Sequence, residues 1–206
     1  MKKLLMAGAA VVALAVGAAG AAQAALINIA GGTFGAIPGN NNVVTPGTQG
    51  FFGSPTLTAT ESVRLTYTFI GKEAGFNNAF QVDGGTVFTN NGTTAGTTFV
   101  TTSGPGLLDF AFLVNNNPAL RIGNGQTIIT QQSVDYFASV IGSGAATTGN
   151  SILIALDDGQ RVDDNHDDLV LRVDAVAVPE PASLALFGAG LLGLGLARRA
   201  RRTAKA

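Results

Sequence analysis

The sequence predicts an all-β fold, an antiparallel β-sandwich of jelly-roll type, between an N-terminal signal peptide and one C-terminal transmembrane helix. Three observations predict the sandwich. Apolar and polar residues alternate with a period of two through the central region, no convincing amphipathic helix occurs there, and Gly- and Asn-rich turns separate the alternating segments. Many short strands with such turns are typical of sandwiches and barrels. No repeat of fixed period is present, so we expect one domain over residues 25–177.

Residues 1–24 have the three parts of a secretory signal peptide. Lys2 and Lys3 provide positive charge, an uncharged apolar stretch follows to about residue 19, and Ala22 and Ala24 are the small residues that signal peptidase needs at its cleavage site. We expect cleavage between Ala24 and Ala25, and therefore export. An uncleaved membrane anchor is the alternative for the same apolar stretch.

Residues 28–60 are rich in Gly, Asn, Thr and Pro and show a low density of strand signals. We expect irregular loops, a covering over the edge of a sheet, or a flexible segment near the new N-terminus.

The clearest predicted strand covers residues 63–70, where Val63, Leu65, Tyr67 and Phe69 alternate with mostly polar residues. Threonine and aromatic residues suit such half-buried pleated surfaces. A turn and a further strand are expected over residues 71–80. The remaining expected strands are Thr97–Thr102, Leu107–Val114, Gln126–Thr130, Val134–Ile141, Ser151–Leu156 and Leu169–Val178.

The charge distribution excludes nucleic-acid binding. Between Ala25 and Glu180 the chain has five Lys and Arg residues against thirteen Asp and Glu, a balance of −8. Such a region offers no basic patch to displace the counterions of a phosphate backbone. The chain also has no cysteine, which excludes disulfides, thiolate metal sites and thiol nucleophiles.

An acidic segment covers residues 157–168, with six aspartates and one asparagine among twelve residues. These carboxylates would repel one another strongly unless solvent or a cation screens them. Ca²⁺ takes six to eight hard oxygen ligands, which this composition could supply. The candidate Ca²⁺ ligands are Asp157, Asp158, Asp163, Asn165, Asp167 and Asp168.

The acidic segment could form two other structures. Asp163, Asn165 and Asp167 match the opening of an EF-hand loop and Asp174 falls at its twelfth position, but Asp168 replaces the required glycine and a strand follows, so we do not expect an EF-hand. The second alternative is a solvated hairpin loop whose aspartates cap turns through local hydrogen bonds to the backbone.

The sequence offers little for catalysis, and we expect no enzymatic activity. His166 is the only histidine, and it lies among carboxylates without a serine nucleophile elbow nearby, so we expect a solvated loop histidine. Glu61, Glu73, Asp109 and Asp135 could supply the paired acids of a glycosidase, but they are scattered along the chain. The Gly-rich stretches lack the lysine and the following helix of a phosphate-binding loop.

The C-terminal end, residues 178–203, combines three features. Pro179, Glu180 and Pro181 come first, residues 182–197 follow without a charge, and a basic cluster ends the segment, consisting of Arg198, Arg199, Arg201 and Arg202. A helix of sixteen residues is about 24 Å long, short of the ~30 Å hydrocarbon core, so the arginines would snorkel or the bilayer would thin. The arginines favour the cytoplasmic side, which places the preceding domain outside. We therefore expect a transmembrane helix over residues 182–197.

This combination resembles a PEP-CTERM sorting signal, with Pro179-Glu180-Pro181 as its tripeptide. The resemblance implies recognition by an exosortase, a membrane transpeptidase that cuts near the motif and transfers the protein to an envelope or extracellular acceptor. It also implies an association with exopolysaccharide and biofilm formation. The expected partners are signal peptidase, the inner membrane before processing, exosortase and exopolysaccharide.

The expected function is therefore that of an exported, non-enzymatic protein of the bacterial envelope or matrix. One alternative is a secreted hydrolase acting on polysaccharide, which needs a cleft with two carboxylates at a fixed distance. Another is a carbohydrate-binding module, which needs an exposed aromatic platform. The chain has no tryptophan, and its only tyrosines are Tyr67 and Tyr136.

Overall fold

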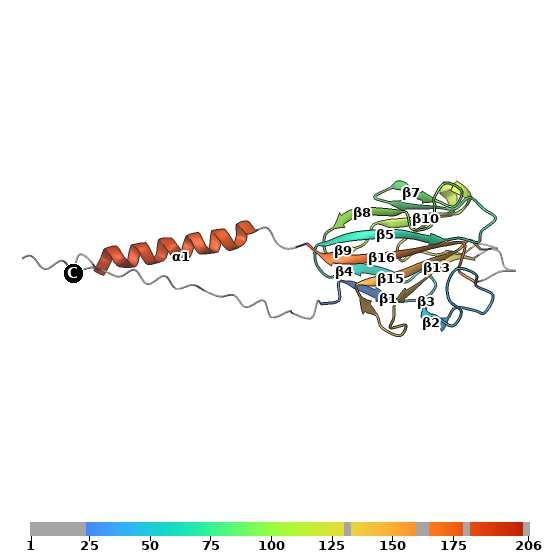
Figure 1. The fold of residues 1–206 in the computed structure, drawn as a ribbon, viewed down its shortest axis with the longest axis horizontal. Helices are drawn as coiled ribbons and strands as arrows, with labels where there is room; N and C mark the ends of the chain where they lie inside the picture. The colour runs from blue at the N-terminus through green and yellow to red at the C-terminus, as the bar shows by residue number, and fades with distance from the viewer. Residues whose placement is uncertain (1–23, 130–132, 160–164, 179–181, 204–206) are drawn as a thin grey trace, which may run out of the picture.

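Antiparallel β-sheets followed by one helix make up the described part of the chain (Figure 1). The computed structural model describes residues 24–129, 133–159, 165–178 and 182–203. The predicted all-β class is confirmed for the region before the helix, because its sheets are built from antiparallel strand pairs. The helix, α1, covers Ala182–Thr203.

The largest sheet contains eight strands. Seven of them follow the order β2 (Thr33–Ala36), β3 (Gln49–Phe52), β13 (Ser133–Val140), β15 (Ser151–Asp157), β16 (Leu169–Ala177), β5 (Val63–Gly71) and β8 (Thr98–Ser103). The eighth, β12 (Ile128–Ile129), pairs with β13. The last strand in the sequence, β16, therefore lies inside the sheet, between β15 and β5.

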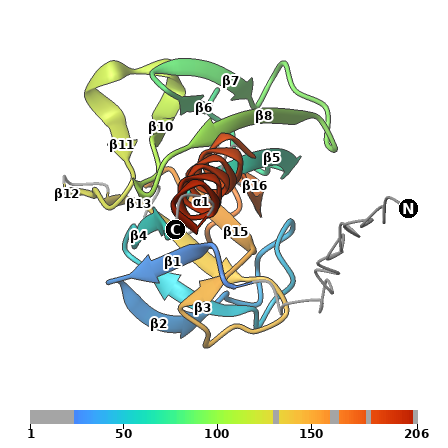
Figure 2. The same cartoon turned by 90° about the vertical axis from the view of Figure 1, so that its left-hand side faces the viewer.

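Two four-stranded sheets accompany the large one. The first has the order β14 (Thr148–Gly149), β1 (Ile27–Ala30), β4 (Thr56–Ala59) and β9 (Gly106–Leu107). The second has the order β11 (Arg121–Gly123), β10 (Phe110–Leu113), β6 (Ala79–Val82) and β7 (Gly85–Thr89). Two 3₁₀ turns, η1 (Val114–Asn116) and η2 (Pro118–Leu120), connect β10 to β11. Figure 2 places the second sheet at the top, β1 to β3 at the bottom, and β13, β15 and β16 between them.

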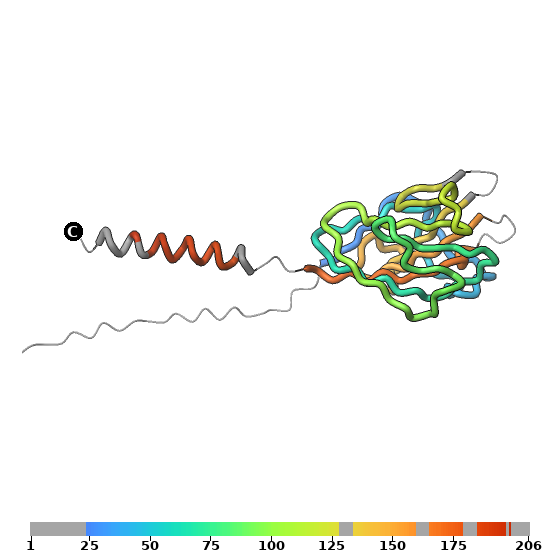
Figure 3. The backbone as a smooth tube through the Cα atoms, turned by 90° about the horizontal axis from the view of Figure 1, so that it is seen from above, coloured from blue at the N-terminus to red at the C-terminus, as the bar shows by residue number. Residues whose placement is uncertain are grey.

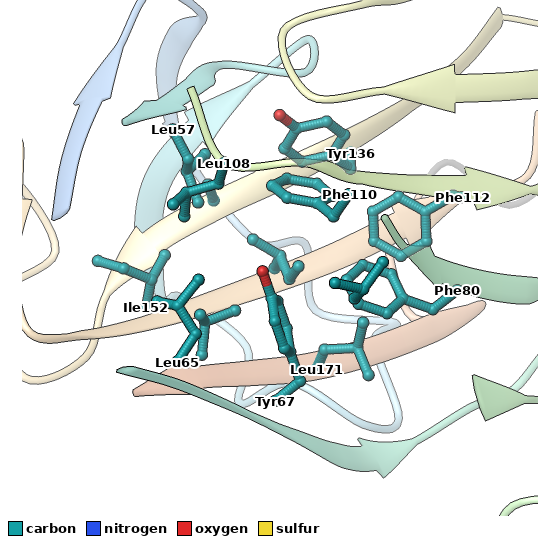
Figure 4. Packing of buried hydrophobic residues seen from close by; sticks show 14 of the residues in the cluster. Leu57, Leu65, Tyr67, Phe80, Leu108, Phe110, Phe112, Tyr136, Ile152 and Leu171 are labelled. Carbon is teal, nitrogen blue, oxygen red and sulfur yellow. The ribbon is translucent and has the colours of Figure 1, made fainter. Parts of the chain in front are cut away.

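The main hydrophobic core joins all three sheets. Val63, Leu65, Tyr67 and Phe69 of β5 are all buried, which confirms the alternation read from the sequence. They pack with buried residues of the small sheets and of β13, β15 and β16 (Figure 4). Each fully buried large apolar side chain contributes about 1.5–3 kcal/mol by leaving water.

Aromatic rings fill the centre of this core. The ring of Phe110 lies 5.6 Å from that of Phe80 and 5.7 Å from that of Tyr136, and the ring of Tyr67 lies 5.3 Å from Phe80. These offset and edge-to-face contacts link β6 and β10 to β5 and β13. The second small sheet is therefore fixed to the large sheet through aromatic packing.

The opposite face of the large sheet is covered by a strap, residues 37–48. Ile37 and Val44 of the strap pack in a second cluster with Phe137, Ala155 and Val170, all of them buried. The covering segment expected over the edge of a sheet therefore lies over a face of the sheet instead. The low strand density expected for residues 28–60 is wrong, because this region also contains β1, β2, β3 and β4. Each has only four residues, too few for alternation to be visible in the sequence.

Candidate functional site

The acidic segment connects β15 to β16 at one end of the large sheet. Asp157 is the last residue of β15, and β16 begins directly after Asp168. Asp157, Asp158 and Asp167 are buried and Asp168 is half-buried. The expectation of a solvated loop is wrong for these residues. Residues 160–164, which include the candidate ligand Asp163, lie outside the described part of the chain.

The turn-capping role expected for the aspartates is confirmed for two of them. The Asp157 Oδ1 atom accepts a hydrogen bond of 2.8 Å from the Gly159 N–H, and the Asp168 Oδ2 atom accepts one of 2.7 Å from the Asp158 N–H. Both are short-range side chain to backbone bonds of the kind that fix turns.

Donors from distant loops bind other groups of the acidic segment. The Asn78 amide donates to Asp158 Oδ2 at 2.8 Å, and the Asn42 N–H donates to Asp167 Oδ2 at 2.8 Å. The Asn90 amide donates to the Asp168 carbonyl at 3.0 Å. A buried carboxylate is costly unless hydrogen bonds compensate its lost hydration. The acidic segment is thus bound to three separate loops by side-chain amides and backbone N–H groups.

Asn41 anchors the strap to the acidic segment. Its Oδ1 atom accepts from the N–H groups of Val43 at 2.9 Å and Val44 at 2.5 Å, and its Nδ2 atom donates to the Asn165 carbonyl at 2.5 Å. Asn165, one of the candidate Ca²⁺ ligands, is buried and therefore has a structural role through its backbone. Asn41, Asn78 and Asn90 could not be predicted as part of the site from the sequence, whose only signal for them is the abundance of asparagine between strands.

Calcium binding stays a prediction, and the hydrogen bonds of the acidic segment favour the turn-capping alternative over it. Within the described ranges, no group of three or more His, Cys, Asp or Glu side chains is arranged to hold a metal ion. Because amides and backbone N–H groups already bind the carboxylates of Asp157, Asp158, Asp167 and Asp168, we expect EDTA to leave the melting temperature of the protein unchanged. Thermal denaturation with EDTA and with added Ca²⁺ checks this. A fall of several degrees with EDTA, reversed by Ca²⁺ and not by Mg²⁺, would contradict it.

His166 is buried, so the expectation of a solvated histidine is wrong. Its Nε2 atom lies 2.7 Å from Oδ1 of Asp135 on β13, and its ring lies 5.0 Å from Phe52 and 6.5 Å from Phe137. Its backbone has a φ of 58°, in the left-handed region. The imidazole therefore joins the end of the acidic segment to β13 within an aromatic environment. Asp135, considered above as an acid of a glycosidase, is the partner of this histidine.

Glu61 and Glu73, two of the other acids considered for catalysis, lie far apart. Glu61 precedes β5 and Glu73 follows it. A nine-residue strand at about 3.3 Å per residue is roughly 30 Å long, whereas the two acids of a glycosidase lie about 5–10 Å apart. A groove of about 470 Å³ lies between the strap and the β13–β14 turn, and no carboxylate lines it.

Both tyrosines are buried, and they differ in their hydrogen bonds. The Tyr136 hydroxyl donates to the Pro55 carbonyl and accepts from the Gly125 N–H at 3.1 Å. Among the described residues, the Tyr67 hydroxyl has no hydrogen-bond partner. Burial raises the pKa of both hydroxyls above their ordinary value, and the charges of Asp83 and Asp109 raise the pKa of Tyr67 further. Neither tyrosine contributes to an exposed aromatic platform.

The two tyrosines should respond oppositely to removal of the hydroxyl. Tyr136→Phe is expected to lower the free energy of unfolding by about 1–3 kcal/mol, because it leaves buried partners unsatisfied. Tyr67→Phe is expected to leave it unchanged or raise it slightly, since an unpaired buried hydroxyl is removed. Urea denaturation of both variants measures the difference. Equal losses would contradict it.

The same burial predicts a loss of stability in alkali. A tyrosine whose pKa is higher in the folded than in the unfolded protein contributes stability that is complete below about pH 10 and is lost as the pH rises above that value. Tyr67→Phe is therefore expected to weaken the decline above pH 10, as measured by urea denaturation at several pH values.

The two ends of the β domain meet at one place. The Thr60 N–H donates to the Leu26 carbonyl at 2.9 Å, and the Val178 N–H donates to the Ser62 carbonyl at 2.9 Å. Leu26 and Val178 therefore flank the turn between β4 and β5, at the end of β16 opposite the acidic segment. Figure 3 shows the blue start and the red-orange end of the β domain at the same end of the molecule. From the length of β16, about 30 Å separates the acidic segment from Val178.

The match to a known family begins where β16 ends. Residues 177–202 match the family model of the PEP-CTERM protein-sorting motif. The chain carries a PEP-CTERM motif. No curated protein and no solved structure matches the chain. The PEP-CTERM motif indicates a protein that exosortase sorts to the outside of the cell.

The described part of the PEP-CTERM motif is mostly helix α1. Its large apolar side chains are exposed: Leu186, Phe187, Leu191, Leu192, Leu194 and Leu196. Within the described residues, no helix combines the length and the apolar character that a membrane crossing requires. Pro179, Glu180 and Pro181 fall within the matched range but outside the described residues, and Arg198 to Arg202 lie in α1.

The predicted signal peptide lies almost entirely outside the described residues, which begin at Ala24. The chain is held in place close to the predicted cleavage site, since Leu26 is buried and its N–H donates to Asn150 Oδ1 at 2.7 Å. Cleavage between Ala24 and Ala25 would leave one residue before this buried position.

Proposed function

We propose that this chain is a non-enzymatic protein of the bacterial envelope or extracellular matrix, whose jelly-roll-like β-sandwich associates with exopolysaccharide after exosortase delivers it. The observation that carries the proposal is the PEP-CTERM motif at residues 177–202, which follows the last strand of an all-β domain without an intervening segment.

The proposed route has three steps. Signal peptidase cleaves between Ala24 and Ala25 during export. The uncharged residues 182–197 hold the protein in the inner membrane, with the arginine cluster on the cytoplasmic side. Exosortase then cuts near Pro179-Glu180-Pro181 and releases the β domain to its acceptor.

A role without catalysis is supported by the way in which the reactive side chains are used. Asp157, Asp158 and Asp168 accept hydrogen bonds that fix turns and loops, and His166 is paired with Asp135 among aromatic rings. The groove beside the strap contains no carboxylate. These groups stabilise the fold at the end of the domain farthest from the chain ends.

Cell fractionation with and without exosortase tests the route. In wild-type cells we expect a product that begins at Ala25, ends near the PEP-CTERM motif and is found outside the inner membrane. In exosortase-deficient cells we expect the larger form, with the arginine cluster retained, in the membrane fraction. Mass spectrometry of the terminal peptides identifies both forms.

Variants of the motif provide the matched comparison. Glu180→Ala should reproduce the exosortase-deficient pattern in otherwise normal cells, whereas Glu61→Ala, an exposed glutamate outside the motif, should be processed normally. Identical size and location with and without exosortase would refute the route. Binding of the purified mature domain to exopolysaccharide of the same cells, measured by co-sedimentation, tests the proposed association.

A further inference from the structure

We propose that, before processing, the tail-side end of the β domain rests on the lipid surface of the membrane that anchors the chain. The tail-side end is defined by Leu26, Thr60–Ser62, Gly104–Leu107 and Val176–Val178. The proposal rests on the proposed function, because it takes α1 as the anchor.

Strand pairing places these segments together. Val178 bonds to Ser62, and Ala177 and Val176 pair with Val63 and Arg64 at the start of β5. β9 pairs with the end of β4, with Gly106 opposite Ala59 and Leu107 opposite Thr58. Figure 1 shows β4, β9 and the end of β16 at the same end of the domain.

The tail-side end exposes apolar side chains. Leu107 is 59% exposed, Val176 is 47% exposed and Val178 is 40% exposed. Glu61 is the exposed charged residue within it, and Arg64 and Asp109, both exposed, flank it, so charges of both signs surround these apolar side chains. Apolar side chains in such a setting gain free energy when they enter the interfacial region of a bilayer.

The short connection between Val178 and α1 is the reason for choosing a lipid surface as the partner of the tail-side end. Three residues separate Val178 from Ala182, the first residue of α1. Four residue steps span at most about 14 Å when fully extended. Anchoring of α1 would therefore keep Val178 close to the bilayer, and a short tether gives weak contacts a high effective concentration. Three side chains would be too few to bind a membrane alone, but they suffice when the tether holds them beside it.

Single cysteine probes test the contact in the full chain, which has no natural cysteine. Leu107→Cys reports on the tail-side end. Phe34→Cys is the matched control, because Phe34 is 49% exposed and strand pairing aligns it with Leu171, six residues before the end of β16. Six strand residues span about 20 Å, so Phe34 lies about that far from the tail-side end along the strand direction. Leu191→Cys reports on α1 itself.

Each variant is labelled with an environment-sensitive fluorophore and reconstituted into vesicles of phosphatidylethanolamine and phosphatidylglycerol that contain nitroxide-labelled lipid. We expect lipid quenching at position 107 to exceed that at position 34 at least threefold. Equal quenching at the two positions would overturn the proposal.

The probe on α1 separates this proposal from the proposed function. Quenching at 191 without quenching at 107 leaves the anchor standing and overturns the lipid contact. Quenching at 107 without quenching at 191 would refute the anchor and, with it, the tethered contact. Protection of position 107 from an aqueous quencher without lipid quenching would indicate a protein occupant, such as a second copy of the chain, and would also overturn the proposal.

Discussion

Asn124→Ala is expected to lower the free energy of unfolding by about 3–5 kcal/mol, because it leaves several buried backbone groups without partners at roughly 1–3 kcal/mol each. Asn124 is buried directly after β11. Its Nδ2 atom donates to the carbonyls of Leu57 at 2.7 Å and Leu108 at 2.8 Å. Its Oδ1 atom accepts from the Leu57 N–H at 2.8 Å and lies 3.1 Å from the Tyr136 hydroxyl oxygen.

These bonds join all three sheets through one side chain. Leu57 lies in β4, Tyr136 lies in β13 of the large sheet, and Asn124 itself continues from β11. Urea denaturation followed by circular dichroism measures the loss. Asn117→Ala is the control, because Asn117 is exposed and makes one local bond to the Ala119 N–H, so a loss of about 1 kcal/mol or less is expected. Equal losses for the two variants would contradict the role of Asn124.

Asn41→Ala is expected to cost about 2–4 kcal/mol and to release the strap, since two backbone N–H groups and the Asn165 carbonyl lose their partner. Besides lowering the overall free energy of unfolding, the substitution should loosen the strap itself. Hydrogen exchange of residues 37–48 should accelerate more than that of β5, because Ile37 and Val44 would no longer be held over Phe137.

The neighbouring asparagine provides the control. The side chain of Asn42 is exposed and makes one bond, of 2.5 Å, to Glu73 Oε2. Asn42→Ala is therefore expected to change stability by about 0.5 kcal/mol or less. The role assigned to Asn41 fails if both variants exchange at the same rate over residues 37–48.

Long alternating strands could be predicted from the sequence, while very short ones could not. Expected and observed bounds agree within one residue for β8, β13, β15 and β16. The expected strand over residues 107–114 divides into β9 and β10, because β9 pairs with β4 in one small sheet and β10 pairs with β6 in the other. The short strands β1 to β4, β11 and β14 have two to four residues each, which is too few for a periodic signal in the sequence.

The candidate site shows the same limit. The composition of residues 157–168 marked the acidic segment, and the local turn-capping bonds of Asp157 and Asp168 followed from it. Its burial did not, because burial depends on donors such as Asn78, which is 80 positions distant from Asp158 in the sequence. The sequence around an isolated loop asparagine does not indicate which distant carboxylate its side chain binds. The PEP-CTERM motif, in contrast, is continuous in the sequence and was recognisable without a structure.

The internal position of β16 determines how the domain withstands a pull on its anchor. Tension at Val178 runs along β16, which is held by six residue pairs to β15 and eight to β5. Because the load is parallel to the strand, these pairings must shear together and cannot peel away one at a time. If the tail followed an edge strand, hydrogen bonds to only one neighbouring strand would resist the same force.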